Sequence, residues 1–285
     1  MAQRNETRRD DRELRSTLDY LEKIGVPELP PLTSPFDPGY DPVTLESHLE
    51  QSSHLMASLK ISLASWMVAR ESATRKKIQA ASRHGVPTVT GGGPFEVAVV
   101  QRQLPAYLDL CAEIGVTRIE CGEGFTDMGV EATAVMAMAE QRGLEVEYEM
   151  GKKHAGPFTE AGFAESIAQA REWAQAGAVQ IVVEGRESAR GVGLFDDDGR
   201  LNQRFAERAA TEFGLETVKF EAPNKPSQFA LLDLLGPQVQ LSNVRLEEVL
   251  RVEIYRRGLH SDSFSKPGLR PRRPVDEEPA TTPET

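Results

Sequence analysis

The chain alternates between amphipathic helical segments that end at a glycine and short apolar segments that end in polar residues. The glycines that end helical segments in the middle of the chain are Gly85, Gly115, Gly143, Gly177 and Gly214. They lie 28 to 37 residues apart, which is about the length of one strand, one helix and their loops. Glycine is favoured just after a helix because it adopts positive φ at little cost. About eight such units close a parallel sheet, so the pattern predicts a (β/α)8 TIM barrel.

Several helices can be placed from their caps and their apolar positions. Thr159 is a suitable N-cap, and the apolar residues that follow it at helical spacing are Phe163, Ile167, Ala170 and Trp173. The segment before Gly258 has the same spacing at Leu246, Val249, Leu250 and Ile254. Pro105 would interrupt a helix that began near Glu96, so we expect a turn there and a new helix with Pro105 near its start. These apolar faces need a sheet to cover.

The two ends of the chain differ from its middle. The length of 285 residues suits a single barrel domain, which we expect to span residues 29–264. Residues 1–28 form a charged N-terminal extension, in which Leu14, Leu18 and Leu21 predict a short helix that packs on the body. Residues 265–285 are rich in proline and charge, so we expect a disordered C-terminal tail that buries too little apolar surface to fold.

Composition excludes several classes of protein. The net charge is −11, which argues against a nucleic-acid partner. No apolar stretch is long enough to span a membrane, and the N-terminus does not resemble an export signal. Cys111 and Cys121 can form neither a disulfide framework nor a four-thiolate zinc site. We therefore expect a cytoplasmic protein that acts on small molecules.

Charged residues gather where the expected strands end. In parallel α/β folds the ligand site lies at the carboxyl ends of the strands. Because side chains alternate across a strand, three pairs each point to one face: Glu147 with Glu149, Lys219 with Glu221, and Glu184 with Arg186. A solvated charge is the simpler interpretation for any single strand. Several charged strand ends together favour a hard divalent ion and an anionic substrate.

Two glycine-rich loops follow apolar segments, at residues 90–96 and 188–193. Their backbone N–H groups could approach a phosphate, and Arg186 and Arg190 would add positive charge. A tight turn with no ligand explains the triple glycine at residues 91–93 equally well, because neither loop matches a nucleotide-binding fingerprint.

In these motifs the chain resembles the phosphosulfolactate synthase family. The strongest match is at residues 183–188 and 191–193, with Arg190 where the family usually has lysine. Further segments that resemble family motifs, in the same order, are residues 91–96, 151–153, 220–223, 241–243 and 256–259. The resemblance covers roughly residues 30 to 265.

The resemblance implies a function as well as a fold. Enzymes of this family add sulfite to phosphoenolpyruvate at the start of one route to coenzyme M. Membership implies a (β/α)8 barrel, dependence on Mg²⁺ and, commonly, a homo-oligomer. During the addition, negative charge moves onto the substrate carboxylate, where a metal ion stabilises it. We therefore predict a carbon–sulfur lyase that acts on small anions.

Three groups of site residues follow from this chemistry. Lys152 or Lys153 is the expected general acid, with a pKa lowered by burial near other cations, and strand alternation does not decide which of them faces the mouth. Phosphate and other anionic groups are expected to bind Lys60, Arg186, Arg190, Gly191, Gly193 and Lys219. The expected oxygen ligands of Mg²⁺ are Glu149, Glu184 and Glu221.

The first four strand ends depart from the family pattern. Pro38 stands where the family has a lysine, residues 62–66 read Ser-Leu-Ala-Ser-Trp in place of Gly-Trp-Gly-Thr-Ser, and residues 122–124 read Gly-Glu-Gly in place of Ser-Asp-Gly. Two alternatives therefore stay open. A divergent enzyme would use another nucleophile or acceptor, and a non-catalytic protein would resemble the plant heat-stress-associated members of the family.

Overall fold

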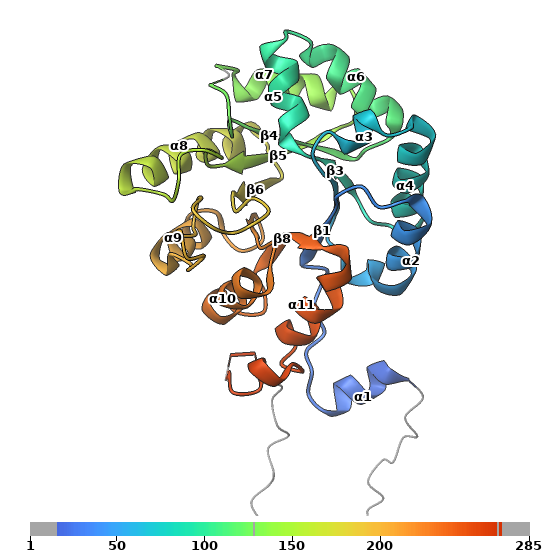
Figure 1. The fold of residues 1–285 in the computed structure, drawn as a ribbon, viewed down its shortest axis with the longest axis vertical. Coiled ribbons are helices and arrows are strands. Elements are labelled where there is room, and N and C mark those ends of the chain that lie inside the picture. The colour runs from blue at the N-terminus through green and yellow to red at the C-terminus, as the bar shows by residue number, and fades with distance from the viewer. Residues whose placement is uncertain (1–15, 128, 267, 270–285) are drawn as a thin grey trace, which may run out of the picture.

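The chain folds into a closed barrel of eight parallel strands that follow one another in chain order, with helices on the outside (Figure 1). The structure is a computed structural model and describes residues 16–127, 129–266 and 268–269. Each strand pairs in parallel with the next, and β8 returns to β1. The predicted (β/α)8 barrel is confirmed.

The strands are short, and most of their residues are buried. They are β1 (Thr33–Asp37), β2 (Leu59–Ile61), β3 (Thr88–Thr90), β4 (Arg118–Gly122), β5 (Glu145–Met150), β6 (Gln180–Val183), β7 (Val218–Glu221) and β8 (Gln240–Arg245).

The helices on the outside of the barrel are α2 (Pro42–Ser52), α3 (Ser65–Val68), α4 (Glu71–Arg83), α5 (Gly92–Val100), α6 (Leu104–Ile114), α7 (Ala132–Glu140), α8 (Glu160–Ala176), α9 (Gln203–Phe213), α10 (Lys225–Leu235) and α11 (Val249–Arg256). Short 3₁₀ turns cover Ser53–Leu55, Leu246–Glu248 and Ser261–Ser263.

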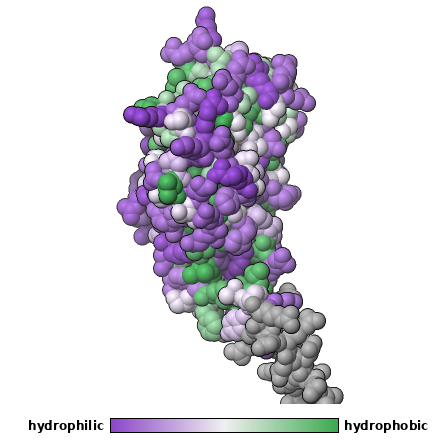
Figure 2. Space-filling model, turned by 90° about the vertical axis from the view of Figure 1, so that its right-hand side faces the viewer, coloured by the Kyte–Doolittle hydropathy of each residue, from purple (hydrophilic) through white to green (hydrophobic). Residues whose placement is uncertain are grey.

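The face of the molecule that carries α4 is mainly hydrophilic, with only small hydrophobic patches, drawn in green (Figure 2).

The glycine pattern marks the helix ends as expected. Gly115 ends α6 with φ of 88° and Gly177 ends α8 with φ of 113°, both in the left-handed region. The other glycines of the pattern also have positive φ: Gly85, Gly143 and Gly214. Pro105 lies in the first turn of α6, after the break that separates this helix from α5.

One predicted helix face is confirmed, and one is partly wrong. The Thr159 hydroxyl accepts a hydrogen bond from the Gly162 N–H at 3.1 Å, and the predicted apolar face of α8 is buried. In the segment before Gly258, however, Leu250 and Ile254 are 42% and 41% exposed. The 3₁₀ turn at residues 246–248 shifts the phase of the helix that follows, so α11 buries Val252 and Tyr255 instead.

Of the two terminal segments, the structure describes residues 16–28 and 265–269 except residue 267. Helix α1 (Thr17–Lys23) forms within the predicted extension, but none of its residues is buried, and it stands apart from the barrel in Figure 1. Leu269, which follows the expected end of the barrel domain at residue 264, is only 5% exposed. The rest of the expected tail, residues 270–285, lies outside the described residues, as do residues 1–15.

Among the described residues, no helix is both long and apolar enough to cross a membrane.

Candidate active site

A pocket of about 700 Å³ opens at the carboxyl ends of the strands. Each of the eight strands contributes a lining residue, either within the strand or just after it. In the order β1 to β8 these are Phe36, Lys60, Gly91, Glu120, Glu149, Glu184, Glu221 and Asn243. A pocket of this size suits a small-molecule ligand. The predicted position of the site, at the mouth of the barrel, therefore agrees with the structure.

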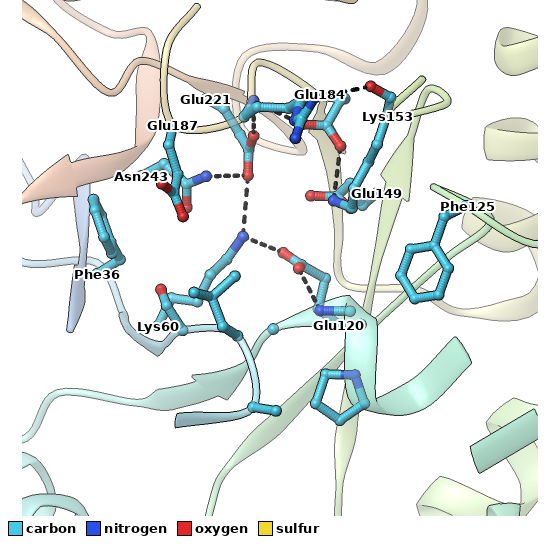
Figure 3. Close-up of a pocket in the computed structure, with 18 of the residues that line it drawn as sticks. Phe36, Lys60, Glu120, Phe125, Glu149, Lys153, Glu184, Glu187, Glu221 and Asn243 are labelled. Atoms are coloured by element: carbon cyan, nitrogen blue, oxygen red, sulfur yellow. Dashed lines mark hydrogen bonds and ion pairs between the residues drawn. The ribbon is translucent and has the colours of Figure 1, made fainter. Parts of the chain in front are cut away.

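Two lysines bridge the carboxylates at the bottom of the pocket (Figure 3). Lys60 Nζ lies 2.6 Å from Glu120 Oε2 and 3.1 Å from Glu221 Oε1. Lys153 Nζ lies 2.7 Å from Glu149 Oε2 and 2.8 Å from Glu184 Oε2. Four carboxylates thus share two ammonium groups, so the cluster has a formal charge of −2 when every member is ionised.

Backbone N–H groups hold three of these carboxylates in place. The N–H groups of Gly185 and Arg186 donate to Glu221 Oε2 at 2.9 and 2.8 Å. The Arg186 N–H also lies 2.6 Å from Glu184 Oε1, and the Gly92 N–H donates to Glu120 Oε1 at 2.8 Å. Arg186 adopts a φ of 54°, which is uncommon for a residue with a side chain. This backbone geometry orients the carboxylates before any ligand binds.

Burial perturbs the acidity of the cluster. Desolvation raises the pKa of Glu120 and that of Glu221 to about 8, and Lys60 only partly opposes this. Desolvation also raises the pKa of Glu184, with the Glu149 carboxylate adding to it. Glu149 differs, because Lys153 and Lys60 outweigh its desolvation and lower its pKa. The mouth is therefore a place where a proton or another cation offsets excess negative charge.

Three buried carboxylates could hold a metal ion. The ligand atoms of Glu120, Glu149 and Glu221 all lie within 4.8 Å of one another. An all-oxygen, anionic donor set suits a hard cation such as Mg²⁺. Two of the three predicted ligands thus come together. The third predicted ligand, Glu184, is not in this group, whose third member is Glu120.

The structure separates the two candidate acids. Lys153 lines the pocket, whereas the Lys152 side chain is 46% exposed and pairs with Asp127 at 2.8 Å. Burial by itself would lower the pKa of Lys153, but the carboxylates of Glu149 and Glu184 outweigh it and raise that pKa. This is the opposite of the expected direction, because the neighbours of Lys153 are mainly carboxylates rather than cations. Lys153 is therefore held as an ammonium group.

The predicted phosphate-binding residues divide into two sets. Arg186 lines the pocket, and its Nη1 donates to the Lys153 carbonyl at 3.3 Å. Arg190, Gly191 and Gly193 are not among the residues that line it. Gly193 instead packs closely against the backbone of Glu184. A Cβ at this position, where φ is 54°, would lie 2.2 Å from the Glu184 carbonyl oxygen. The loop at residues 188–193 thus places its first part, including Ser188, in the pocket.

Lys219 lies below the pocket, in a second charged layer of the barrel. Its Nζ lies 2.7 Å from Glu147 Oε2, which also contacts Arg118 Nη1 at 3.2 Å. Lys219 is 1% exposed, and desolvation lowers its pKa. Of the two predicted anion-binding lysines, only Lys60 lines the pocket.

Cys121, which lies near the end of β4, is buried, and desolvation raises its pKa well above the ordinary value.

Sequence reasoning missed Glu120 and Glu96. Glu120 is the partner of Glu147 in the register of β4 and β5, so the alternation that selected Glu147 could have selected it too. Glu96 lies in α5 and is completely buried. Its carboxylate accepts the N–H groups of Gly124, Phe125 and Thr126 at 2.9 to 3.0 Å, and the Thr126 hydroxyl at 2.7 Å. Only the three-dimensional fold shows that Glu96 holds the loop after β4.

We expect the metal-free protein to lose stability as the pH rises from about 4.5 to about 8. The raised pKa values of Glu120 and Glu221 mean that folding favours their protonated forms, a contribution that is lost as each carboxyl ionises. Chemical denaturation in EDTA at several pH values measures this slope. Glu120→Gln should reduce the slope, by up to about 1.4 kcal/mol per pH unit, whereas the exposed control Glu216→Gln should not. Equal slopes in all three proteins would contradict the prediction.

Glu96→Gln should loosen the loop after β4. The amide carries no charge and offers one acceptor oxygen to four donors, so we expect a loss of about 1.5–3 kcal/mol in the free energy of unfolding. Hydrogen exchange should rise at Gly124, Phe125 and Thr126. Glu113→Gln, at an exposed carboxylate that pairs with Arg75, serves as the control. Unchanged exchange in this loop would show that Glu96 does not hold it.

Solved structures with similar folds support the barrel alone. The carboxyl transferase domain of Rhizobium etli pyruvate carboxylase has a TM-score of 0.53 and 14% identity, over 90% of this chain and 48% of that one. A 3-dehydroquinate dehydratase from Geobacillus kaustophilus has a TM-score of 0.51 and 12% identity, over 78% and 89% of the two chains. At this level of identity the likeness carries no information about activity.

Sequence relatives are more informative. A phosphosulfolactate synthase from Methanocaldococcus jannaschii is 29% identical over 236 residues, which cover 82% of this chain and 94% of the relative. Another from Methanothermobacter thermautotrophicus is 25% identical over 257 residues, 89% of this chain and 100% of the relative. One from Bacillus subtilis is 29% identical over 191 residues, 66% and 75% of the two. Residues 27–262 match the family described as (2R)-phospho-3-sulfolactate synthase (ComA), and the chain therefore belongs to that family.

Proposed function

We propose that this chain catalyses the addition of sulfite to phosphoenolpyruvate, which gives phosphosulfolactate. The observation that carries the proposal is the group of Glu120, Glu149 and Glu221 beside Lys153 at the bottom of the pocket. This group combines an all-oxygen donor set with a fixed ammonium, and family membership supports the reaction type. The last four strand ends, which retain the family motifs, supply most of these side chains.

In the proposed reaction the sulfur lone pair of sulfite forms a bond to the methylene carbon of phosphoenolpyruvate. The π electrons of the carbon–carbon double bond move toward the carboxylate, and the adjacent carbon then takes a proton. Lys153 is the proposed donor of this proton, because Glu149 and Glu184 fix its Nζ at 2.7 and 2.8 Å. Solvent returns the proton to Lys153, so the addition is balanced.

The remaining residues bind and orient the substrates. Arg186 is proposed to bind the phosphate, since its guanidinium lines the pocket. Lys60 bridges the carboxylates of Glu120 and Glu221 and offers positive charge to an anion. Mg²⁺ held by Glu120, Glu149 and Glu221 would supply a Lewis acid for the charge that develops on the substrate carboxylate.

Product formation should require a divalent cation. Incubation with phosphoenolpyruvate, sulfite and Mg²⁺, followed by mass spectrometry, should detect phosphosulfolactate. EDTA should lower the rate at least ~10²-fold, as removal of a group that stabilises developing charge does, and added Mg²⁺ should restore it. Full activity in chelated enzyme would reject the metal, and no product under any condition would favour another acceptor or a non-catalytic role.

Lys153→Met should lower kcat by about 10²- to 10⁴-fold, the range for loss of a general acid. Lys152→Met is the matched control, because Lys152 lies next in the chain but pairs with Asp127 at the surface, and its kcat should stay near wild type. Lys153→Arg keeps the positive charge between Glu149 and Glu184 but is a far weaker acid. It should preserve the melting temperature without restoring kcat. Wild-type turnover in Lys153→Met would exclude this assignment.

A further inference from the structure

The pocket has a charged half and an apolar half. The carboxylates and lysines occupy the ends of β4 to β7 together with β2. Four of the apolar side chains that line the pocket are large and exposed: Leu63, Met67, Val97 and Phe125, which we call the apolar wall. They come from the loop after β2, from α3, from α5 and from the loop after β4. Phe125 lies across the cavity from Phe36 and Asn243 (Figure 3).

The apolar wall remains open to solvent. Leu63 is 59% exposed, Val97 53%, Met67 49% and Phe125 46%. Large apolar side chains that line a concave site, with this much surface in contact with water, favour an apolar ligand group. Because they meet the carboxylate cluster in one pocket, the ligand that covers them also reaches the cluster.

The fold holds the apolar wall in place. Leu63 adopts a φ of 55°, which is costly for a leucine and indicates that its surroundings fix it. Gly91 makes this possible, since a Cβ there would lie 2.9 Å from the Leu63 nitrogen. Phe125 is fixed on the other side, where its N–H donates to Glu96 Oε2 at 3.0 Å. The wall is therefore a preformed surface on a supported backbone.

Electrostatics argues against a small anion on this wall. The cations among the described lining residues are Lys60, Lys153 and Arg186, and the first two each contact two carboxylates. Five carboxylates also line the pocket, so they outnumber the cations: Glu120, Glu149, Glu184, Glu187 and Glu221. A small anion placed against the wall would lose hydration without gaining a charged partner there.

We infer that this pocket also accepts a larger carboxylic acid, whose apolar substituent of a few carbon atoms lies on the apolar wall while its carboxylate lies at Glu120, Glu149 and Glu221. The inference rests on the proposed function for the position of the carboxylate. It assigns to the pocket a second substrate class besides phosphoenolpyruvate: carboxylates with an unsaturated or 2-oxo group and an apolar side chain. Phosphoenolpyruvate has no such side chain, so the apolar wall would stay exposed to solvent when phosphoenolpyruvate binds.

Binding of two 2-oxo acids tests the inference without requiring turnover. Calorimetry of the Mg²⁺-loaded protein compares pyruvate with 4-methyl-2-oxopentanoate. The second acid has the same 2-oxo carboxylate but an isobutyl group in place of the methyl group of pyruvate. Each buried methylene should raise affinity about fourfold, so we expect the larger acid to bind at least ~10-fold more tightly. Equal affinities, or no binding of either acid, would overturn the inference.

Two valines on α5 provide a matched pair of variants. Val97 lines the pocket, whereas Val100, 57% exposed on the same helix, is not among the lining residues. Val97→Lys should remove most of the preference for 4-methyl-2-oxopentanoate, and Val100→Lys should leave it unchanged. Equal effects of the two substitutions would overturn the inference. A lower molecular mass in solution for Val97→Lys, with the preference retained, would instead assign the wall to a contact between copies of the chain.

The two proposals can fail separately. Absence of product from phosphoenolpyruvate and sulfite, together with a preference for the larger acid that Val97→Lys removes, would reject the proposed substrates and leave the apolar subsite standing. Efficient product formation together with equal binding of the two acids would reject the subsite and leave the proposed function standing.

Discussion

The burial of more negative than positive charge inside the mouth of a closed barrel is the constraint on which this structure depends. Four carboxylates at the ends of β4 to β7 are almost inaccessible to solvent, and only Lys60 and Lys153 lie between them. Uncompensated charge is costly in such surroundings. The pKa values of Glu120 and Glu221 rise to about 8 for this reason. Carboxylates that hold protons at neutral pH would also bind a divalent cation, which would compete with those protons.

A comparison with the layer below shows that this imbalance is a property of the mouth rather than of the whole barrel. In the lower layer Glu147 meets both Lys219 and Arg118, and Arg118 also contacts Glu145 at 2.7 Å. Negative and positive groups there are equal in number, which makes an ordinary structural network. The two layers arise from the same alternation along β5 and β7. Of these two layers, the one that lines the pocket carries the charge excess.

The sequence predicted the barrel and which charged residues of β5 and β7 share a face, but not the height of each residue within the barrel. Alternation correctly placed Lys219 and Glu221 on one face, yet only Glu221 lines the pocket, because two residues along a strand span about 7 Å. The turn at Gly151, with φ of 120°, decides that Lys153 rather than Lys152 faces the mouth. Such turns depend on contacts between loops, here the Lys153 N–H to the Gly124 carbonyl at 2.6 Å, which no local pattern encodes.

Contacts distant in sequence also explain why Glu96 and the role of Gly193 were beyond prediction. Glu96 acts on a loop that lies 28 to 30 residues further along the chain, and Gly193 supports the backbone of Glu184. Both residues lie in segments that matched family motifs, so the match identified the segments without indicating what the residues do. The predicted phosphate loop, in particular, contributes Arg186 and Ser188 to the pocket and uses its glycines for packing.

The departures of the N-terminal strand ends from the family pattern take on a physical meaning in this arrangement. The charged half of the pocket must keep its ionic groups, because loss of one partner would leave another buried and unpaired. The side chains of the apolar wall are under no such constraint, since they carry no charge and need only match a ligand in volume and polarity. Substitution at Leu63 or Phe125 can therefore change what is bound while Lys153 and the carboxylates keep their positions. The barrel thus places the groups that we propose for the reaction and those that we propose for substrate selection in different parts of one pocket.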